Sequence, residues 1–447
     1  MNTRRSDGRL LPILSVAFVG SLGFSIVLPF LVFVVTRLGG NALVYGAVGA
    51  TYSALQLIGA PILGRWSDRH GRRKILLLSQ IGTLLSWVVF LGALYLPVTP
   101  IASIDSSLLG SFTLTVPLAV LFLARALDGL TGGNVSVANA YLADITDEKD
   151  RSANFGKMAV ASNLGFVLGP AIAGLLGDTA AGEVPPVMAA IAVSVVASLI
   201  IFFRLPESRP TLLDSRVGDH SVGNVLGQEH KECYTVEEPH EVGLAEALRP
   251  AGIRLLLGVH FLVFLAFNFM YIALPVHAAT RLEWTLTEVG IFFSVLGLMM
   301  TVVQGPILGA LTKVTGDRTL LHGGTLILAF GFALYSFPSV PMIYAGAAGV
   351  ALGNGLMWPS LLALISRAAD DRAQGAVQGF ASSSSAVASI SGLLVGGLLY
   401  DRMGGSIFLV SAAITTVALI VSFIPAVHDH GPNGEGDVDS VGDVASV

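Results

Sequence analysis

Twelve long apolar stretches run through the 447-residue chain, and each has the length of a membrane-spanning helix. The hydrocarbon core of a bilayer is about 30 Å thick and requires about 20 apolar residues per helix. Only 12% of the residues are charged, whereas a typical soluble domain has about 25%, so the composition excludes a soluble enzyme, a disordered chain and a disulfide scaffold. We therefore predict an all-α membrane protein with spans at about 10–36, 42–63, 75–96, 113–143, 156–177, 185–204, 253–280, 287–311, 321–339, 342–366, 374–400 and 405–426.

Lysine and arginine are distributed very unevenly over the segments between these stretches. If the N-terminus is cytoplasmic, 21 of the 25 basic residues lie on the cytoplasmic side, and only Arg37, Arg281 and Arg402 lie outside. Cytoplasmic loops of membrane proteins carry an excess of basic residues. The sequence therefore predicts a multi-pass protein of the cell (inner or plasma) membrane with both termini in the cytoplasm.

The chain also contains an internal repeat that divides it into two halves. The sequence P-I-L-G occurs at 61–64 and again at 306–309, six spans later. Such repeats indicate two related bundles, with a substrate site near the midplane of the bilayer where the bundles meet. We predict two pseudo-symmetric six-helix bundles at 1–204 and 251–427, joined by a polar cytoplasmic linker at 205–250 and followed by a disordered tail at 428–447.

Several motifs support a more specific interpretation. Residues 64–74, G-R-W-S-D-R-H-G-R-R-K, follow the second span; residues 121–129 carry an arginine inside the fourth span; and residues 165–174 follow the pattern G-x-x-x-G-P-x-x-x-G. With these motifs the chain resembles the major facilitator superfamily over nearly its whole length. Residues 140–156 make it most similar to the tetracycline efflux proteins of that superfamily. The resemblance implies the major facilitator fold and, through 165–174, a proton-coupled antiporter.

The chain departs from the tetracycline efflux proteins at two positions. Those transporters carry acids in their first and third helices, where this chain has Ser21 and Ser86. The resemblance therefore implies the fold and the antiport mechanism, but it does not extend to tetracycline as the substrate.

Two opposite charges lie inside the fourth span. A charge at the centre of a bilayer costs about 2.5–3.5 kcal/mol, so such residues face a cavity or one another. Arg125 and Asp128 are three residues apart and share one face of a helix, and helical steps continue that face through Gly132, Ser136 and Asn139. An acid beside an arginine can exchange its ion pair for a proton, which predicts a coupling element. The alternative is a permanent structural pair.

Other polar residues inside the spans are weaker candidates for the substrate or coupling site. His260 could carry a second proton, or it could be a neutral histidine bonded to a neighbour, and we expect His277 to be interfacial. Amides in membrane helices also bond neighbouring helices, which is the alternative for most of this set. The further candidates are Gln56, Asn163, Asn268, Gln304, Asn354 and Trp358.

The loop at 64–74 is a candidate gate. We expect its arginines to pair with Asp144 at the cytoplasmic end of the fourth span, Gly64 to allow close helix approach and Gly71 to allow a tight turn. In the resembled family this cluster latches the two halves together; the alternative is charge that only sets topology. Lys313 stands where the second half would repeat Asp68, so we expect a one-sided latch. The predicted gating residues are Gly64, Asp68, Arg69, Gly71, Arg72, Arg73 and Asp144, and the antiporter pattern comprises Gly165, Gly169, Pro170 and Gly174.

The chain lacks the common sequence signatures of nucleotide and metal chemistry. It contains neither a P-loop nor an H-E-x-x-H motif, and it has one cysteine and a net charge of −5. We therefore expect no enzymatic activity, cofactor, metal or nucleic-acid partner, and a monomer in the lipid bilayer driven by an ion gradient. The first hypothesis is a proton-coupled exporter of a small apolar or amphipathic compound. The alternatives are an importer or facilitator of a polar metabolite, such as a sugar or organic ion, and a membrane receptor without transport.

Overall fold

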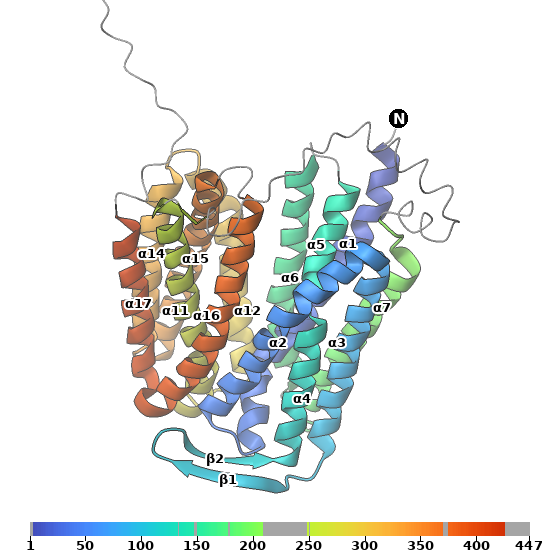
Figure 1. Ribbon diagram of the computed structural model, residues 1–447. Coiled ribbons are helices and arrows are strands. Elements are labelled where there is room, and N and C mark those ends of the chain that lie inside the picture. Colours follow the sequence, from blue (N-terminus) through green and yellow to red (C-terminus); the bar gives the residue numbers. More distant parts are fainter. Residues whose placement is uncertain are drawn as a thin grey trace, which may run out of the picture.

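The computed structural model consists of two helical bundles side by side (Figure 1). It describes residues 3–132, 134–146, 150–177, 179–208, 248–249, 251–369 and 374–424. The predicted linker at 205–250 falls almost entirely outside these residues, and the predicted tail at 428–447 falls wholly outside them.

The N-terminal bundle contains six helical rods, the fourth of which is made of two helices. The helix that carries Arg125 and Asp128 ends at Thr131, and a second helix continues from Asn134 toward the end of the bundle where the chain begins. The helices are α1 (Thr3–Arg37), α2 (Ala42–His70), α3 (Arg72–Tyr95), α4 (Val116–Thr131), α5 (Asn134–Ile145), α6 (Arg151–Gly177) and α7 (Val184–Arg204).

The C-terminal bundle repeats this arrangement. Its second rod changes from α-helix to a short π-helix at Pro306, the proline of the repeated P-I-L-G sequence. A proline inside a helix removes a backbone hydrogen bond and distorts the helix. The elements are α11 (Ala251–Arg281), α12 (Leu286–Val302), η2 (Val303–Ile307), α13 (Leu308–Leu311), α14 (Asp317–Leu334), α15 (Val340–Ala368), α16 (Gln374–Met403), η3 (Gly404–Ser406) and α17 (Ile407–Ser422).

The predicted twelve-helix architecture is confirmed. Ten segments of the described chain are long and apolar enough to cross a membrane; one of them, Val377–Ser422, contains both α16 and α17, and α14 adds the twelfth rod. Large apolar side chains also point away from the bundles, among them Leu175 at 74% exposed and Phe203 at 72%. An outer surface of this kind suits contact with lipid rather than with water.

One predicted boundary is wrong. The stretch at 113–143 is not a single helix, because its first residues belong to a β-hairpin of β1 (Pro100–Ser106) and β2 (Gly110–Thr115). The alternating, β-branched sequence Gly110–Thr115 favours a strand. Pro117 occupies the first turn of α4, where proline is well tolerated. The length of an apolar stretch alone does not show where a β-strand ends and a helix begins within it.

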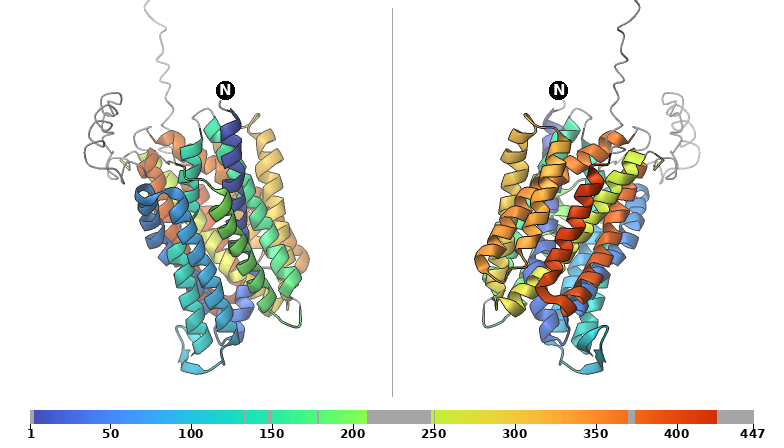
Figure 2. Two further views of the ribbon diagram at one scale, coloured as in Figure 1. Left: turned by 90° about the vertical axis from the view of Figure 1, so that its right-hand side faces the viewer. Right: turned by 90° about the vertical axis from the view of Figure 1, so that its left-hand side faces the viewer.

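The two bundles contact each other mainly at the end that carries the hairpin, called here the hairpin end (Figure 1). Figure 2 shows the hairpin at this end of the molecule from two further sides. Gly46 of α2 lies against the backbone of Leu393 in α16, and Gly397 of α16 lies against Ala42. On the other side of the molecule, Gly174 of α6 packs against α12. At the opposite end a Cβ atom placed on Gly64 or Gly305 would meet no neighbouring atom. The bundles are therefore closed together at the hairpin end.

A set of polar contacts, called here the clasp, joins the bundles at the hairpin end. The Asp401 carboxylate of α16 accepts hydrogen bonds from the backbone N–H groups of Ala42 (3.3 Å) and Leu43 (3.2 Å), at the N-terminus of α2. Arg402 donates to the carbonyl of Leu108 at the hairpin tip (2.9 Å). A carboxylate at a helix N-terminus satisfies free N–H groups and interacts favourably with the helix dipole. The hairpin and α16 thus stabilise the closed arrangement.

Replacing Asp401 with alanine should weaken this closure. Loss of a helix cap costs about 1 kcal/mol, so the hairpin end should open about fivefold more often. The measurement is the labelling rate of Leu393→Cys by a membrane-impermeant maleimide, in a Cys233→Ser background. Asp105→Ala is the matched control, because among the described residues Asp105 accepts its side-chain hydrogen bond from Ser111, within the hairpin itself. Equal labelling rates in the two variants would contradict a role for the clasp.

Candidate functional site

The predicted pair in the fourth span is formed. Arg125 Nη1 donates to Asp128 Oδ2 at 2.8 Å, and the two residues are only 5% and 6% exposed. Thr83 and Ser86 of α3 lie close to the Asp128 carboxylate, and the Ser86 hydroxyl group donates to the Thr83 carbonyl at 2.7 Å. Ser86 is one of the two positions at which the resemblance would place an acid. The pair is therefore buried, and α3 lies beside it.

Tyr52 and Gln56 of α2 complete the surroundings of this pair. The Arg125 guanidinium carbon lies 4.7 Å from the centre of the Tyr52 ring, within the range of a cation–π interaction. Gln56 Nε2 donates both to Tyr52 Oη (3.0 Å) and to the carbonyl of Gly132 (3.1 Å). Gln56 was a candidate from the sequence, whereas no motif in the sequence pointed to Tyr52.

A cavity of about 370 Å³, called here the N-bundle cavity, opens beside the pair. Its lining is mostly apolar, and all six rods of the N-terminal bundle contribute to it. Asp128 and Gln56 border it, as does Asn139, whereas Ser136 is exposed and does not. Of the predicted polar stripe, Gly132 and Asn139 thus border the cavity and Ser136 does not. The other notable lining residues are Ser21, Phe24, Tyr52, Gln80, Thr83, Trp87, Ser162 and Phe166.

A smaller cavity of about 210 Å³, called here the interface cavity, lies between α6, α11 and α12. It is bordered by Asn163 and Pro170 of the first half and by Tyr271 and Gln304 of the second, and Phe166 borders both cavities. The sequence placed the site between the bundles. Of these two cavities, the larger instead lies within the first bundle and the smaller lies between the bundles.

Four candidates from the second half border neither of these two cavities: His260, Asn268, Asn354 and Trp358. His260 is buried and its ring packs against that of Trp358, with ring centres 5.0 Å apart and the planes tilted by 31°. Asn268 donates to the carbonyl of Phe264 at 2.8 Å and packs against Gly392. His277 lies near the end of α11, where it is 4% exposed and its Nδ1 atom contacts Tyr400 Oη at 3.3 Å; its interfacial position stays a prediction.

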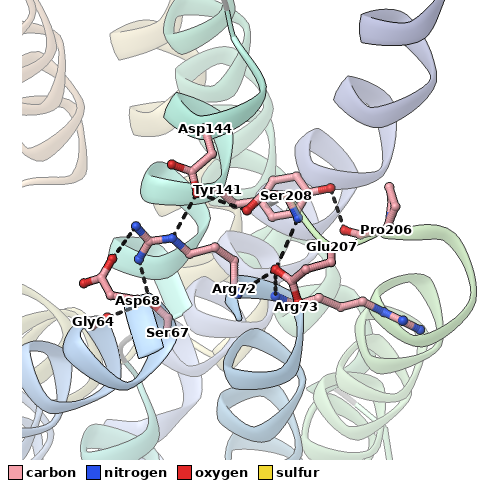
Figure 3. A network of polar contacts seen from close by, with 10 residues as sticks. All are labelled: Gly64, Ser67, Asp68, Arg72, Arg73, Tyr141, Asp144, Pro206, Glu207 and Ser208. Carbon is pink, nitrogen blue, oxygen red and sulfur yellow. Dashed lines mark hydrogen bonds and ion pairs between the residues drawn. The ribbon is translucent and has the colours of Figure 1, made fainter. Parts of the chain in front are cut away.

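The predicted gating loop forms a polar network around Arg72, called here the loop network (Figure 3). Arg72 pairs with Asp68 at 2.6 Å and with Asp144 at 3.1 Å, and it also donates to Ser67 Oγ at 2.6 Å. The Glu207 carboxylate accepts from the backbone N–H groups at the start of α3, and Ser208 donates to Asp144 at 3.0 Å. The network therefore joins the ends of α2, α3, α5 and the segment after α7.

Several details of this network differ from the prediction. Arg73 does not reach Asp144, because it donates to the carbonyls of Ile201 and Phe202 in α7. Glu207 and Ser208 were not predicted as members of the network. No motif in the sequence shows that their segment lies beneath α3. All members belong to the N-terminal bundle, so the loop network does not latch the two halves in this structure.

The two loop glycines also behave differently. Gly71 has a positive φ of 98°, and a Cβ atom there would lie 2.6 Å from Glu207 Oε2, so the tight turn is confirmed. Gly64 allows no close approach here, because a Cβ atom on it would meet nothing within 4 Å. Arg69 is the remaining predicted gating residue, and its role stays a prediction.

The second half has an ion pair at the corresponding place. Asp317, at the start of α14, pairs with Arg367, near the end of α15. In the first half the arginine is at the start of α3 and the acid is at the end of α5. The acid and the arginine thus occupy opposite positions in the two halves. This pair was not predicted from the sequence, because the acid of the second half was expected at the position of Lys313.

The antiporter pattern at residues 165–174 lies on α6 and makes contacts with two other helices. Gly165 and Gly169 lie against α1, where Ser25 Oγ donates to the Gly165 carbonyl at 3.0 Å. Gly174, four residues after Pro170, packs against Gly290 of α12 across the two halves. Small residues allow such close approach of membrane helices. The predicted close packing is confirmed, and part of it lies between the bundles.

Replacing Asp144 with alanine should destabilise the N-terminal bundle by about 1–3 kcal/mol, because Arg72 Nε and Ser208 Oγ lose the buried carboxylate that accepts from them. The Asp144 side chain is 3% exposed, whereas that of Asp68 is 58% exposed. Asp68→Ala is therefore the matched control, with an expected cost of about 0.5 kcal/mol. Thermal unfolding in detergent measures both; an equal loss would show that burial does not set the strength of this network.

Two helical bundles, a cavity beside a buried ion pair and a loop network at one end are features of a transport protein. The sequence profile described as Major Facilitator Superfamily matches residues 13–305 and 256–438. The chain therefore belongs to the Major Facilitator Superfamily.

Relatives in sequence include two bacterial resistance proteins. The class E tetracycline resistance protein of Escherichia coli is 29% identical over 418 residues, covering 91% of this chain and 93% of that protein. Multidrug resistance protein 2 of Bacillus subtilis (strain 168) is 23% identical over 426 residues, covering 92% of this chain and 94% of that protein.

Solved structures show the same fold. The human organic anion transporter MFSD10 (TETRAN) matches with a TM-score of 0.62 at 20% identity, covering 93% of this chain and 99% of that one. The xylose transporter XylE of E. coli, in an inward-open conformation, matches with a TM-score of 0.69 at 15% identity, covering 92% and 94%.

Proposed function

We propose that this protein is a proton-coupled antiporter that exports a small apolar or amphipathic compound by alternating access. The observation that carries the proposal is the buried Arg125–Asp128 pair, whose acid borders a mostly apolar cavity. An acid in this position can hold a proton or a substrate group, but not both, which is the basis of exchange. The names of the relatives in sequence, which are resistance proteins, agree with export.

The direction of opening follows from the distribution of charge. The basic residues favour a cytoplasmic location for the end where the chain begins, in the inner or plasma membrane. Because the bundles are closed together at the hairpin end, we propose that this arrangement is the state open toward the cytoplasm. In that state the loop network cannot join the halves. We propose that it does so when the hairpin end opens, and that the protein works as a monomer without a cofactor.

The energy source is proposed to be the proton gradient. One charge that crosses 100 mV supplies about 2.3 kcal/mol, and each pH unit supplies about 1.4 kcal/mol more. The coupling carboxylate would therefore be Asp128, with Arg125 as its ionic partner. The aromatic side chains Phe24, Trp87 and Phe166 would contact the apolar part of the substrate.

The test is transport by the purified protein in proteoliposomes with an imposed pH gradient, with tetracycline and ethidium as probes. Uptake that rises with the gradient, accompanied by proton movement in the opposite direction, is the expected result. A second function, uptake of a polar metabolite, is favoured by the scarcity of acids within the spans, so D-xylose is included. The antiporter proposal would be overturned if D-xylose were transported at a rate independent of the pH gradient and neither drug probe were transported.

A further inference from the structure

Tyr52 is the side chain that joins the N-bundle cavity to the buried ion pair. It borders the cavity, where its ring lies 5.4 Å from that of Phe24. The same ring lies 4.7 Å from the guanidinium carbon of Arg125, which does not itself border the cavity. A compound in the cavity would therefore meet Tyr52 before it could affect Arg125.

Arg125 depends on this ring more than its ion pair suggests. Its side chain makes one hydrogen bond, from Nη1 to Asp128, and its Nε atom is buried without a hydrogen-bond partner in the described part of the chain. Cation–π attraction is strongest where the cation is desolvated. Movement of the Tyr52 ring would change how Arg125 is held, and with it how firmly the Asp128 carboxylate is paired.

The hydroxyl group of Tyr52 extends the connection to the helix break. It accepts a hydrogen bond from Gln56, which also donates to the carbonyl of Gly132, at the point where α4 ends. A Cβ atom on Gly132 would lie 3.2 Å from Tyr52 Oη, so this contact is tight. Displacement of Tyr52 would therefore also displace the end of α4, the helix that carries Arg125 and Asp128.

We infer that Tyr52 is the positioning residue through which an occupant of the N-bundle cavity tightens the Arg125–Asp128 pair, so that Asp128 releases its proton. The inference rests on the proposed function, because it assumes that the cavity holds the substrate and that Asp128 holds the proton. Two other tyrosines lie within electrostatic range of Arg125: Tyr45 of α2, which borders neither of the two cavities, and Tyr271 of α11, which borders the interface cavity.

The experiment measures protons released per probe bound. Tetracycline and ethidium are added to the purified full-length protein in weakly buffered detergent; a pH dye reports protons, and calorimetry reports binding. Tyr52→Leu removes the ring, Tyr52→Phe removes only the hydroxyl group, and Phe24→Leu alters the same cavity without touching Arg125. Tyr271→Leu tests the other cavity. Size-exclusion profiles and thermal midpoints show that each variant is folded.

Tyr52→Leu should bind a probe but release about tenfold fewer protons per bound molecule, because the cation–π contact is gone. Tyr52→Phe should keep most of the release, since it keeps the ring. Phe24→Leu should weaken binding without changing the ratio at saturation, and a purely structural role for Tyr52 would not separate these two quantities.

The inference would be overturned if Tyr52→Leu released as many protons per bound probe as the wild-type protein. It would also be overturned if Tyr271→Leu lost the release instead. Either result would leave the antiporter proposal standing. A wild-type protein that releases no proton with either probe would contradict the proposed function, and the inference with it.

Discussion

Asp128→Asn is expected to abolish proton-driven transport. Asparagine keeps the shape of the side chain but cannot lose or gain a proton at neutral pH, so the exchange of proton for substrate has no carrier. General acid–base groups typically contribute factors of about 10² or more, and flux driven by a pH gradient should fall by at least about that much. Exchange of substrate for substrate, which needs no net proton movement, should persist. Both rates are measured in proteoliposomes.

The substitution also leaves Arg125 as a buried charge without its partner. Removal of one member of a buried pair costs about 3–5 kcal/mol, so a loss of flux through unfolding must be distinguished. The control is the double variant Arg125→Gln with Asp128→Asn, which removes both charges. It should regain much of the lost thermal stability but none of the coupling. Gradient-driven flux in either variant at the wild-type rate would show that Asp128 carries no proton.

Gly46→Val is expected to prevent closure of the hairpin end. A Cβ atom at Gly46 would collide with the carbonyl oxygen of Leu393, which is backbone and cannot move aside as a side chain could. Small residues are what permit this approach of α2 to α16. The variant should fold, because the substitution leaves the packing within each bundle unchanged, but it should remain open at the hairpin end. An antiporter held in one state does not turn over, so transport should fall by about 100-fold or more.

Distances between spin labels measure this change. Labels at the exposed positions Val98 and Leu409 report the hairpin end, and labels at Leu11 and Val314 report the opposite end. In Gly46→Val the first distance should lengthen and the second should shorten. Gly92→Val is the control, because a Cβ atom on Gly92 would meet nothing within 4 Å. If the control and Gly46→Val gave the same two distances, the contact with Leu393 would not govern closure.

Local features of the sequence were enough to establish the architecture. Helix length and hydropathy depend only on neighbouring residues, so the twelve spans could be placed from apolar stretches alone. The repeated P-I-L-G sequence indicated two halves, and the spacing of Arg125 and Asp128 indicated their pairing, because residues three apart share a helix face. The tight turn at Gly71 followed from the same kind of local argument.

Contacts between distant segments could not be predicted in this way. No local pattern shows that Glu207 lies under the start of α3, that Arg73 reaches α7 rather than Asp144, or that Tyr52 lies against Arg125. The position of the larger cavity inside the first bundle, and the clasp between Asp401 and α2, likewise depend on how whole helices pack. The sequence alone therefore determined which segments cross the membrane and which charges lie within them. The tertiary structure decided which of those charges face a cavity and what holds the bundles together, because packing joins residues that are far apart in the chain.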